Sequence, residues 1–124
     1  VYPEVKKGFT QAEAVGTALA SGAPFYIKTG IEEGEKINIG GFHLRMEDGC
    51  ICADRSEVFT DNKKFRTISK TPKIGEKASL EIFVEPNLIE VFINDGEYVL
   101  SNVVYGLKDE AEGNIHEVYL WKQE

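Results

Sequence analysis

The sequence predicts an all-β fold, an antiparallel β-sandwich of two sheets with one short helix near its start. Segments rich in β-branched and aromatic residues recur along most of the chain, and turn residues separate them at short intervals. Asn94-Asp95-Gly96 carries the Asp-Gly signal of a tight hairpin. Only one segment, close to the N-terminus, combines the start and stop signals of a helix.

Length and charge limit the classes of function. The chain has 124 residues, a formal net charge of −7, and hydrophobic and charged fractions of 42% and 28%. These values are typical of one soluble globular domain. An acidic surface repels phosphate backbones, and no run approaches the ~20 apolar residues of a membrane helix, so we expect no nucleic-acid or membrane partner. The chain has only two cysteines and two histidines, which is few for a structural metal site. We therefore assign no metal and no cofactor.

The N-terminal segment differs from the rest of the chain. We expect residues 1–24 to form a linker or N-terminal segment, and residues 25–124 to form the sandwich domain. Thr10-Gln11-Ala12-Glu13 has the form of a capping box, and Gly22 is suited to end a helix. The sequence therefore predicts a short helix over residues 11–20.

The next part of the chain alternates between apolar and polar residues, which is typical of half-buried strands. The strands predicted in this part cover residues 25–31, 36–39, 42–46 and 50–53. Residues 56–76 are polar and less regular, so no strand is predicted there. We expect Cys50 and Cys52 to lie on opposite faces of their strand and to be free thiols, which fits a reducing cytoplasm.

The clearest strand signals lie in the second half of the chain. The strands predicted in this part cover residues 79–84, 88–93, 98–105 and 118–121. In the first two, one set of alternating positions is aliphatic and forms the expected core face. The other set combines Glu81 with Phe83 and Glu90 with Phe92. A face that mixes carboxylates with aromatic rings is not simply solvated, so we expect it to contact loops of the same domain, a partner domain or a sugar ring.

Residues 80–85 (LEIFVE) and 89–97 (IEVFINDGE) resemble the paired strands of the C-terminal β-sandwich in glycoside hydrolase family 32, which includes invertases, sucrose-6-phosphate hydrolases, inulinases and levanases. Asp54-Arg55-Ser56 is similar to the Asp-Arg-Ser segment of that family, and residues 118–121 are similar to its closing strand. The match covers about residues 42–121 in order, with Glu85 standing where the family commonly has Asp. The resemblance implies a lectin-like jelly roll that follows a catalytic domain, an N-terminal five-bladed propeller.

The resemblance also implies where the catalytic groups of the family lie. They belong to Asn-Asp-Pro, Arg-Asp-Pro and Glu-Cys segments of the propeller, and this sequence contains none of the three, because Gly96 follows Asn94-Asp95. A retaining glycosidase needs two carboxyl groups ~5–5.5 Å apart. We therefore expect no catalytic residue in this chain, and no hydrolysis of sucrose or fructans by the chain alone.

Other polar residues give no catalytic pattern. His43 lies in a predicted strand and His116 in a polar segment, and we expect both to be surface or turn residues rather than members of a catalytic triad. The acidic segment 109–113 lacks the ligand spacing of a calcium loop, so we expect it to be a solvated loop.

Three functions remain open. The first is a non-catalytic sandwich of a β-fructosidase, such as a cytoplasmic sucrose-6-phosphate hydrolase rather than a secreted levanase, that stabilises the propeller or forms a homodimer contact. Phe83, Phe92 and Trp121 are the candidate contact residues, unless they belong to the sandwich core.

The second function is a carbohydrate-binding module that holds fructose or a fructan. Asp54, Arg55 and Glu90 are its candidate substrate-binding residues, because they lie in the matched motifs and supply donors and acceptors. In the structural alternative, Arg55 forms an ion pair with Glu90 and fixes the loop on the sheet. The third function is a lectin-like interaction domain that is unrelated to sugars.

Overall fold

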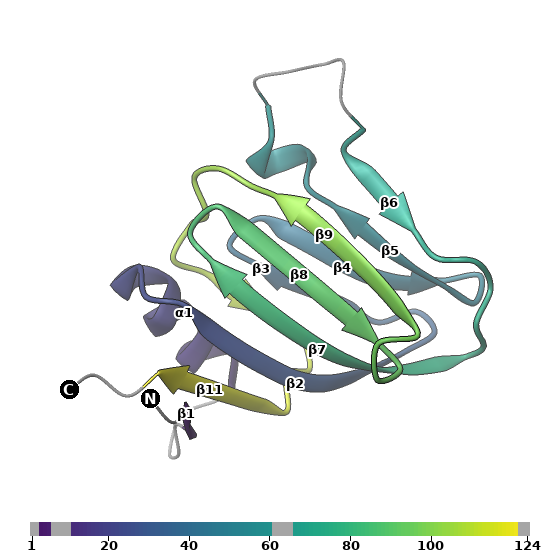
Figure 1. Cartoon of the computed structure of the whole chain (residues 1–124), viewed down its shortest axis with the longest axis horizontal. Coiled ribbons are helices and arrows are strands. Elements are labelled where there is room, and N and C mark those ends of the chain that lie inside the picture. Colours follow the sequence, from purple (N-terminus) through teal and green to yellow (C-terminus); the bar gives the residue numbers. More distant parts are fainter. Residues whose placement is uncertain (1–2, 6–10, 61–65, 122–124) are drawn as a thin grey trace.

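Two antiparallel sheets stack face to face in the computed structural model, which describes residues 3–5, 11–60 and 66–121 (Figure 1). The six-stranded sheet has the order β1 (Pro3–Val5), β11 (Glu117–Trp121), β2 (Phe25–Glu32), β7 (Lys77–Glu85), β8 (Leu88–Ile93) and β9 (Tyr98–Val103). The five-stranded sheet has the order β10 (Ala111–Glu112), β3 (Lys36–Ile39), β4 (Phe42–Glu47), β5 (Cys50–Asp54) and β6 (Ile68–Lys70). The predicted antiparallel β-sandwich is confirmed.

The core lies between the sheets and is filled by side chains that alternate along each strand. The six-stranded sheet buries the predicted aliphatic positions of β7 and β8, which are Leu80, Ile82, Val84, Ile89, Val91 and Ile93. The five-stranded sheet buries Ile37, Ile39, Phe42, Leu44, Met46, Ile51 and Ala53. Because the inward positions are apolar on both sheets, the outward positions carry the polar and aromatic residues from which a site can be built.

The hairpin between β8 and β9 follows the Asp-Gly signal. The Glu97 N–H donates to the Asn94 carbonyl at 3.3 Å and closes a turn whose central residues, Asp95 and Gly96, have φ of 59° and 90°. Positive φ at both central positions is the requirement of a type I′ turn. The predicted tight hairpin is confirmed.

The single helix, α1 (Gln11–Ser21), packs at the β10 and β11 ends of the two sheets (Figure 1). It buries Ala14, Val15 and Ala18 in the same core as the strands. The helix ends at Gly22, whose φ is 73° and whose N–H donates to the Leu19 carbonyl. The predicted helix is confirmed, while Thr10 of the expected capping box lies outside the described residues and the division between 1–24 and 25–124 stays a prediction. No helix in the described ranges is long and apolar enough to cross a membrane.

Three strands and one short helix were not predicted. They are β1, β6, β10 and the 3-10 helix η1 (Ser56–Val58). The acidic segment 109–113, expected to be a solvated loop, contains β10, whose Ala111 and Glu112 pair with Ile39 and Asn38 of β3. Gly113 follows at a φ of 118°, close to the β3 backbone. β1 lies in the N-terminal segment and pairs with β11.

The expected placement of Cys50 and Cys52 on opposite faces was wrong. Residues two apart on a strand share a face, and both cysteines lie on the outer side of β5, in register with Glu47 and Arg45 of β4. Both are free thiols, as expected.

Candidate functional site

The Asp54-Arg55-Ser56 segment forms a corner where the chain leaves β5. One carboxylate oxygen of Asp54 accepts a hydrogen bond from the Ser56 N–H at 2.9 Å, an Asx-type turn that redirects the chain. The other oxygen lies 3.9 Å from a guanidinium nitrogen of Arg45. The Val58 N–H then donates to the Arg55 carbonyl at 3.0 Å within η1. The Asp54 carboxylate therefore shapes the corner.

The Arg55 guanidinium fastens this corner to two other segments. Its Nε and Nη2 donate to the Arg66 carbonyl at 3.2 and 2.8 Å, and its Nη1 donates to the Val103 carbonyl at 2.9 Å. Its Cζ lies 3.9 Å from the centroid of the Phe59 ring, at cation–π distance. Because Arg66 precedes β6 and Val103 ends β9, Arg55 ties the edges of the two sheets together.

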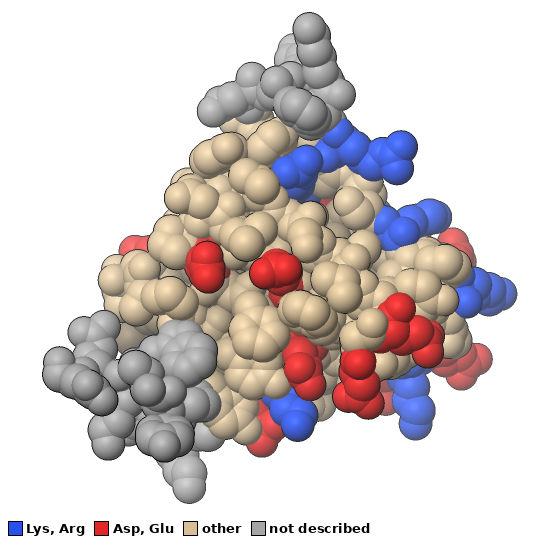
Figure 2. Space-filling view, in the orientation of Figure 1, with Lys and Arg blue, Asp and Glu red and all other residues tan. Residues whose placement is uncertain are grey.

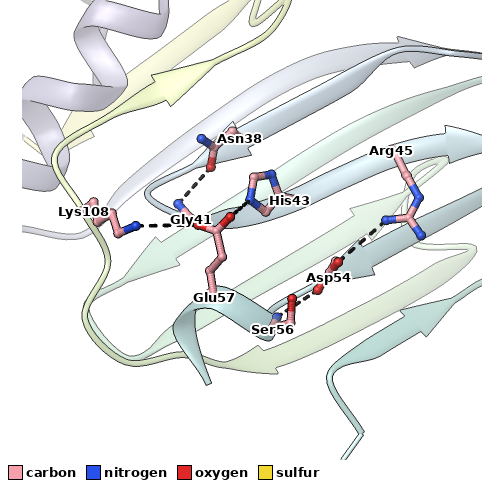
Figure 3. Close-up of polar contacts among 8 residues, drawn as sticks. All are labelled: Asn38, Gly41, His43, Arg45, Asp54, Ser56, Glu57 and Lys108. Atoms are coloured by element: carbon pink, nitrogen blue, oxygen red, sulfur yellow. Dashed lines mark hydrogen bonds and ion pairs between the residues drawn. The ribbon is translucent and has the colours of Figure 1, made fainter. Parts of the chain in front are cut away.

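Glu57 forms a second polar cluster beside the corner, on the outer side of the five-stranded sheet (Figure 3). Its carboxylate oxygens lie 2.9 Å from His43 Nε2 and 3.7 Å from Lys108 Nζ. Gly41 leaves room for this carboxylate, since a Cβ there would lie 3.2 Å from Glu57 Oε2. The Gly41 N–H donates to Asn38 Oδ1 at 2.8 Å. The cluster holds η1 against β4.

Glu90 lies away from the corner, on the outer side of the six-stranded sheet. It stands in register with Phe83 of β7 and Ser101 of β9, and its carboxylate accepts a hydrogen bond from the Ser101 hydroxyl at 3.4 Å. In the part of the chain that the structure describes, Arg55 and Glu90 form no ion pair, so that structural alternative was wrong. The Arg55 donors reach backbone carbonyls instead.

A row of aromatic rings crosses the same outer face. The Tyr26 and Phe83 rings stack with centroids 4.7 Å apart, and Tyr119 and Phe92 extend the row at 5.4 and 5.5 Å. Phe83 is 38% exposed, so it is not a core residue. The side chain of Trp121, the third aromatic candidate, lies outside what the structure describes. Tyr26 and Tyr119 were missed, although strand alternation places Tyr26 opposite to the buried Phe25 and Ile27.

The carboxylates around these rings change the acidity of the two tyrosines. Partial burial and the nearby Glu81 carboxylate raise the pKa of Tyr26, with smaller effects from Tyr119 and Glu117. Partial burial and the Glu117 carboxylate raise the pKa of Tyr119. Both phenols therefore stay protonated at neutral pH.

The described residues offer little catalytic chemistry. His43 is paired with Glu57, and His116 is exposed, with its backbone N–H donating to Thr29 Oγ1 at 3.1 Å. Among residues 3–5, 11–60 and 66–121, no three His, Cys, Asp or Glu side chains gather as metal ligands.

Comparisons with known proteins place this architecture in a family. The chain is 40% identical over 42 residues to a sucrose-6-phosphate hydrolase from Escherichia coli, which is 34% of this chain and 9% of that protein. It superposes on the structure of sucrose-6-phosphate hydrolase from Lactobacillus gasseri with a TM-score of 0.65 at 18% identity, covering 83% of this chain and 25% of that one. The chain thus spans a quarter or less of either relative's length. The family model described as "Glycosyl hydrolases family 32 C terminal" matches residues 11–123. With nearly the whole sandwich inside that match, the chain belongs to the C-terminal domain family of the family 32 glycosyl hydrolases.

Proposed function

We propose that this chain is the non-catalytic β-sandwich of a family 32 β-fructosidase and that it stabilises the catalytic propeller of that enzyme. The observation that carries the proposal is the match of a C-terminal domain model to residues 11–123 of a sequence that lacks all three catalytic segments. Similarity to two sucrose-6-phosphate hydrolases supports sucrose 6-phosphate as the substrate of the whole enzyme.

The reading frame that encodes this chain provides the first test. We expect several hundred codons upstream of Val1, with Asn-Asp-Pro, Arg-Asp-Pro and Glu-Cys segments. Deletion of residues 11–123 from that protein should lower its melting temperature and its yield of soluble enzyme. The 124-residue chain alone should release no fructose from sucrose, sucrose 6-phosphate or inulin. Fructose release by the pure chain, or a deletion without effect on melting, would contradict the proposal.

A second candidate function is the binding of fructose or a fructan. It is favoured by Glu90, whose carboxylate lies beside the exposed Phe83 ring and combines an acceptor with an apolar floor. Asp54 and Arg55 are the other residues proposed for it, although three of the five guanidinium N–H groups of Arg55 already donate to carbonyls. Calorimetric titration with fructose, levan and sucrose tests this function. Binding that Glu90→Ala abolishes, in a folded variant, would support it, and no saturable binding at millimolar sugar would reject it.

The third function, a lectin-like interaction domain unrelated to sugars, receives no support from the match to a glycosyl hydrolase family. We propose a cytoplasmic location for the enzyme, supported by the free thiols of Cys50 and Cys52. A homodimer contact is a further proposal, which sedimentation of the whole enzyme would test.

A further inference from the structure

The outer face of the six-stranded sheet combines apolar surface with unpaired negative charge. Residues in register form rows across the strands of this sheet. The first row consists of Glu117, Lys28, Glu81, Phe92 and Val99. The neighbouring row consists of Tyr119, Tyr26, Phe83, Glu90 and Ser101, and a shorter third row of Glu85, Leu88 and Val103. We call these three rows the aromatic–carboxylate face.

This face carries most of the exposed large hydrophobic side chains of the described residues. Among the described residues, five large hydrophobic side chains are exposed, and three of them, Phe83, Val99 and Val103, lie on this face. Exposed apolar patches rimmed by polar groups are typical of protein interaction sites. The described loops leave Phe83 open to solvent, so cover from the domain's own loops, one of the sequence expectations, is incomplete.

The charge of the face selects the kind of partner. Four carboxylates, those of Glu81, Glu85, Glu90 and Glu117, accompany one ammonium group, that of Lys28, which gives a formal charge of −3. None of the four lies within 4 Å of a cationic group in the described residues. In Figure 2, carboxylates are scattered over a mostly uncharged surface, whereas Lys and Arg side chains gather mainly towards β6. A second copy that presented the same face would be repelled.

The ring geometry favours a protein partner over a sugar. A sugar stacks on the open face of an aromatic ring, whereas Phe83 is stacked on Tyr26 at an interplanar angle of 29° and meets Phe92 at 84°. The carboxylates beside these rings suit a cationic side chain. Arginine meets this requirement, because its guanidinium binds carboxylates in a bidentate manner, and the exposed part of Phe83 offers its apolar stem a surface to pack on.

We propose that the aromatic–carboxylate face is the surface by which the sandwich docks on an arginine-bearing patch of the catalytic domain. This inference rests on the proposed function. It is supported by β1, which lies at the β11 edge of the same sheet (Figure 1), so that a domain preceding Pro3 in the chain is tethered beside Tyr119. Glu81 and Glu90 are the central anchors, because they flank Phe83 in neighbouring rows.

The test reverses two charges in the whole enzyme and follows its thermal unfolding by calorimetry. The variant Glu81→Lys/Glu90→Lys should lower the melting temperature of the catalytic domain by at least ~4 °C, or split one transition into two, because buried interface charges then repel arginine. The control Glu76→Lys/Glu112→Lys makes the same change in charge at exposed positions away from the face and should shift melting by less than ~2 °C. The 124-residue chain with Glu81→Lys/Glu90→Lys should keep its β circular dichroism spectrum, which shows that the sandwich itself still folds.

Two outcomes would overturn the docking proposal and leave the proposed function of the domain in place. In one, deletion of residues 11–123 destabilises the enzyme while Glu81→Lys/Glu90→Lys melts like the control. In the other, the control variant destabilises the enzyme as much as the variant on the face, which places the contact elsewhere. A deletion that leaves melting unchanged would instead reject the proposed function. The isosteric Glu81→Gln/Glu90→Gln variant should have an intermediate effect, because it removes charge without adding repulsion.

Discussion

Replacement of Arg55 by alanine is the sharpest test of how the two sheets are joined. The change removes three hydrogen bonds, of 3.2, 2.8 and 2.9 Å, to the carbonyls of Arg66 and Val103, and a cation–π contact with Phe59. Each such bond contributes roughly 0.5–1.5 kcal/mol net, and the ring contact at a partly exposed site about 0.5–1 kcal/mol. Water can reach the freed carbonyls, so we expect a loss of about 2–3 kcal/mol in the free energy of unfolding.

The assay is urea and thermal unfolding of the 124-residue chain. At this chain length 1 kcal/mol corresponds to roughly 4 °C, so the melting temperature should fall by about 8–12 °C. Arg55→Lys keeps the charge but reaches fewer carbonyls, and it should lose about half as much. Arg66→Ala is the matched control, because that residue contributes its backbone carbonyl rather than its exposed side chain, and it should change stability by less than ~0.5 kcal/mol. If Arg55→Ala unfolds at the same urea concentration as Arg66→Ala, the guanidinium does not join the sheets.

Three other predictions concern stability. Gly113→Ala should lower the free energy of unfolding in urea by about 3 kcal/mol or more, because φ is 118° and a Cβ would lie 2.7 Å from a β3 carbonyl. Gly34→Ala, at a φ of 88° in open space, should lower it by about 1 kcal/mol. Equal losses would contradict the steric argument. Thr71→Val should lower the free energy of unfolding in urea by about 1–3 kcal/mol, because the buried hydroxyl accepts a hydrogen bond from the Ile51 N–H at 3.0 Å. An unchanged free energy would mean that water replaces the hydroxyl as the acceptor. The raised pKa of Tyr26 means that the folded protein holds this proton more tightly than the unfolded chain, so its contribution is present below about pH 10 and is lost as pH rises through the folded-state pKa. The melting temperature of Tyr26→Phe should therefore fall less steeply than that of the unmutated protein between about pH 9 and about pH 11. An unchanged slope would refute the assignment.

The strands that bury one face were predictable from the sequence, because their alternation is set by the core. β8 is the clearest example, with Ile89, Val91 and Ile93 buried and the intervening positions partly exposed. β6 was not predictable in this way, since it is a three-residue edge strand whose Ile68 is 43% exposed. Its pairing with β5 depends on backbone groups that every residue has.

The candidate site was predictable only in part, for a similar reason. The Asp54-Arg55-Ser56 motif marks a real corner, but the partners of Arg55 are carbonyls 11 and 48 residues away along the chain. Every residue type has a backbone carbonyl, so the sequence does not mark which carbonyls Arg55 binds. An acidic side chain such as Glu90 was the partner that the sequence suggested, and that choice was wrong. The aromatic row is different, because Tyr26 and Tyr119 become neighbours only through the β2–β11 register, which joins distant segments.

The insertion of β11 between β1 and β2 has a consequence for synthesis on the ribosome. β2 pairs with β11 from the Phe25–Leu120 pair to the Lys28–Glu117 pair, so one side of β2 has no partner strand until residue 120 has been made. At ~5–20 residues per second that interval lasts roughly 5–20 s, far longer than the microseconds in which a β-hairpin forms. Until β11 has been made, β2 is an open edge of the sheet that it forms with β7, β8 and β9, and charged Lys28 and Glu32 on that edge strand disfavour pairing with another nascent chain.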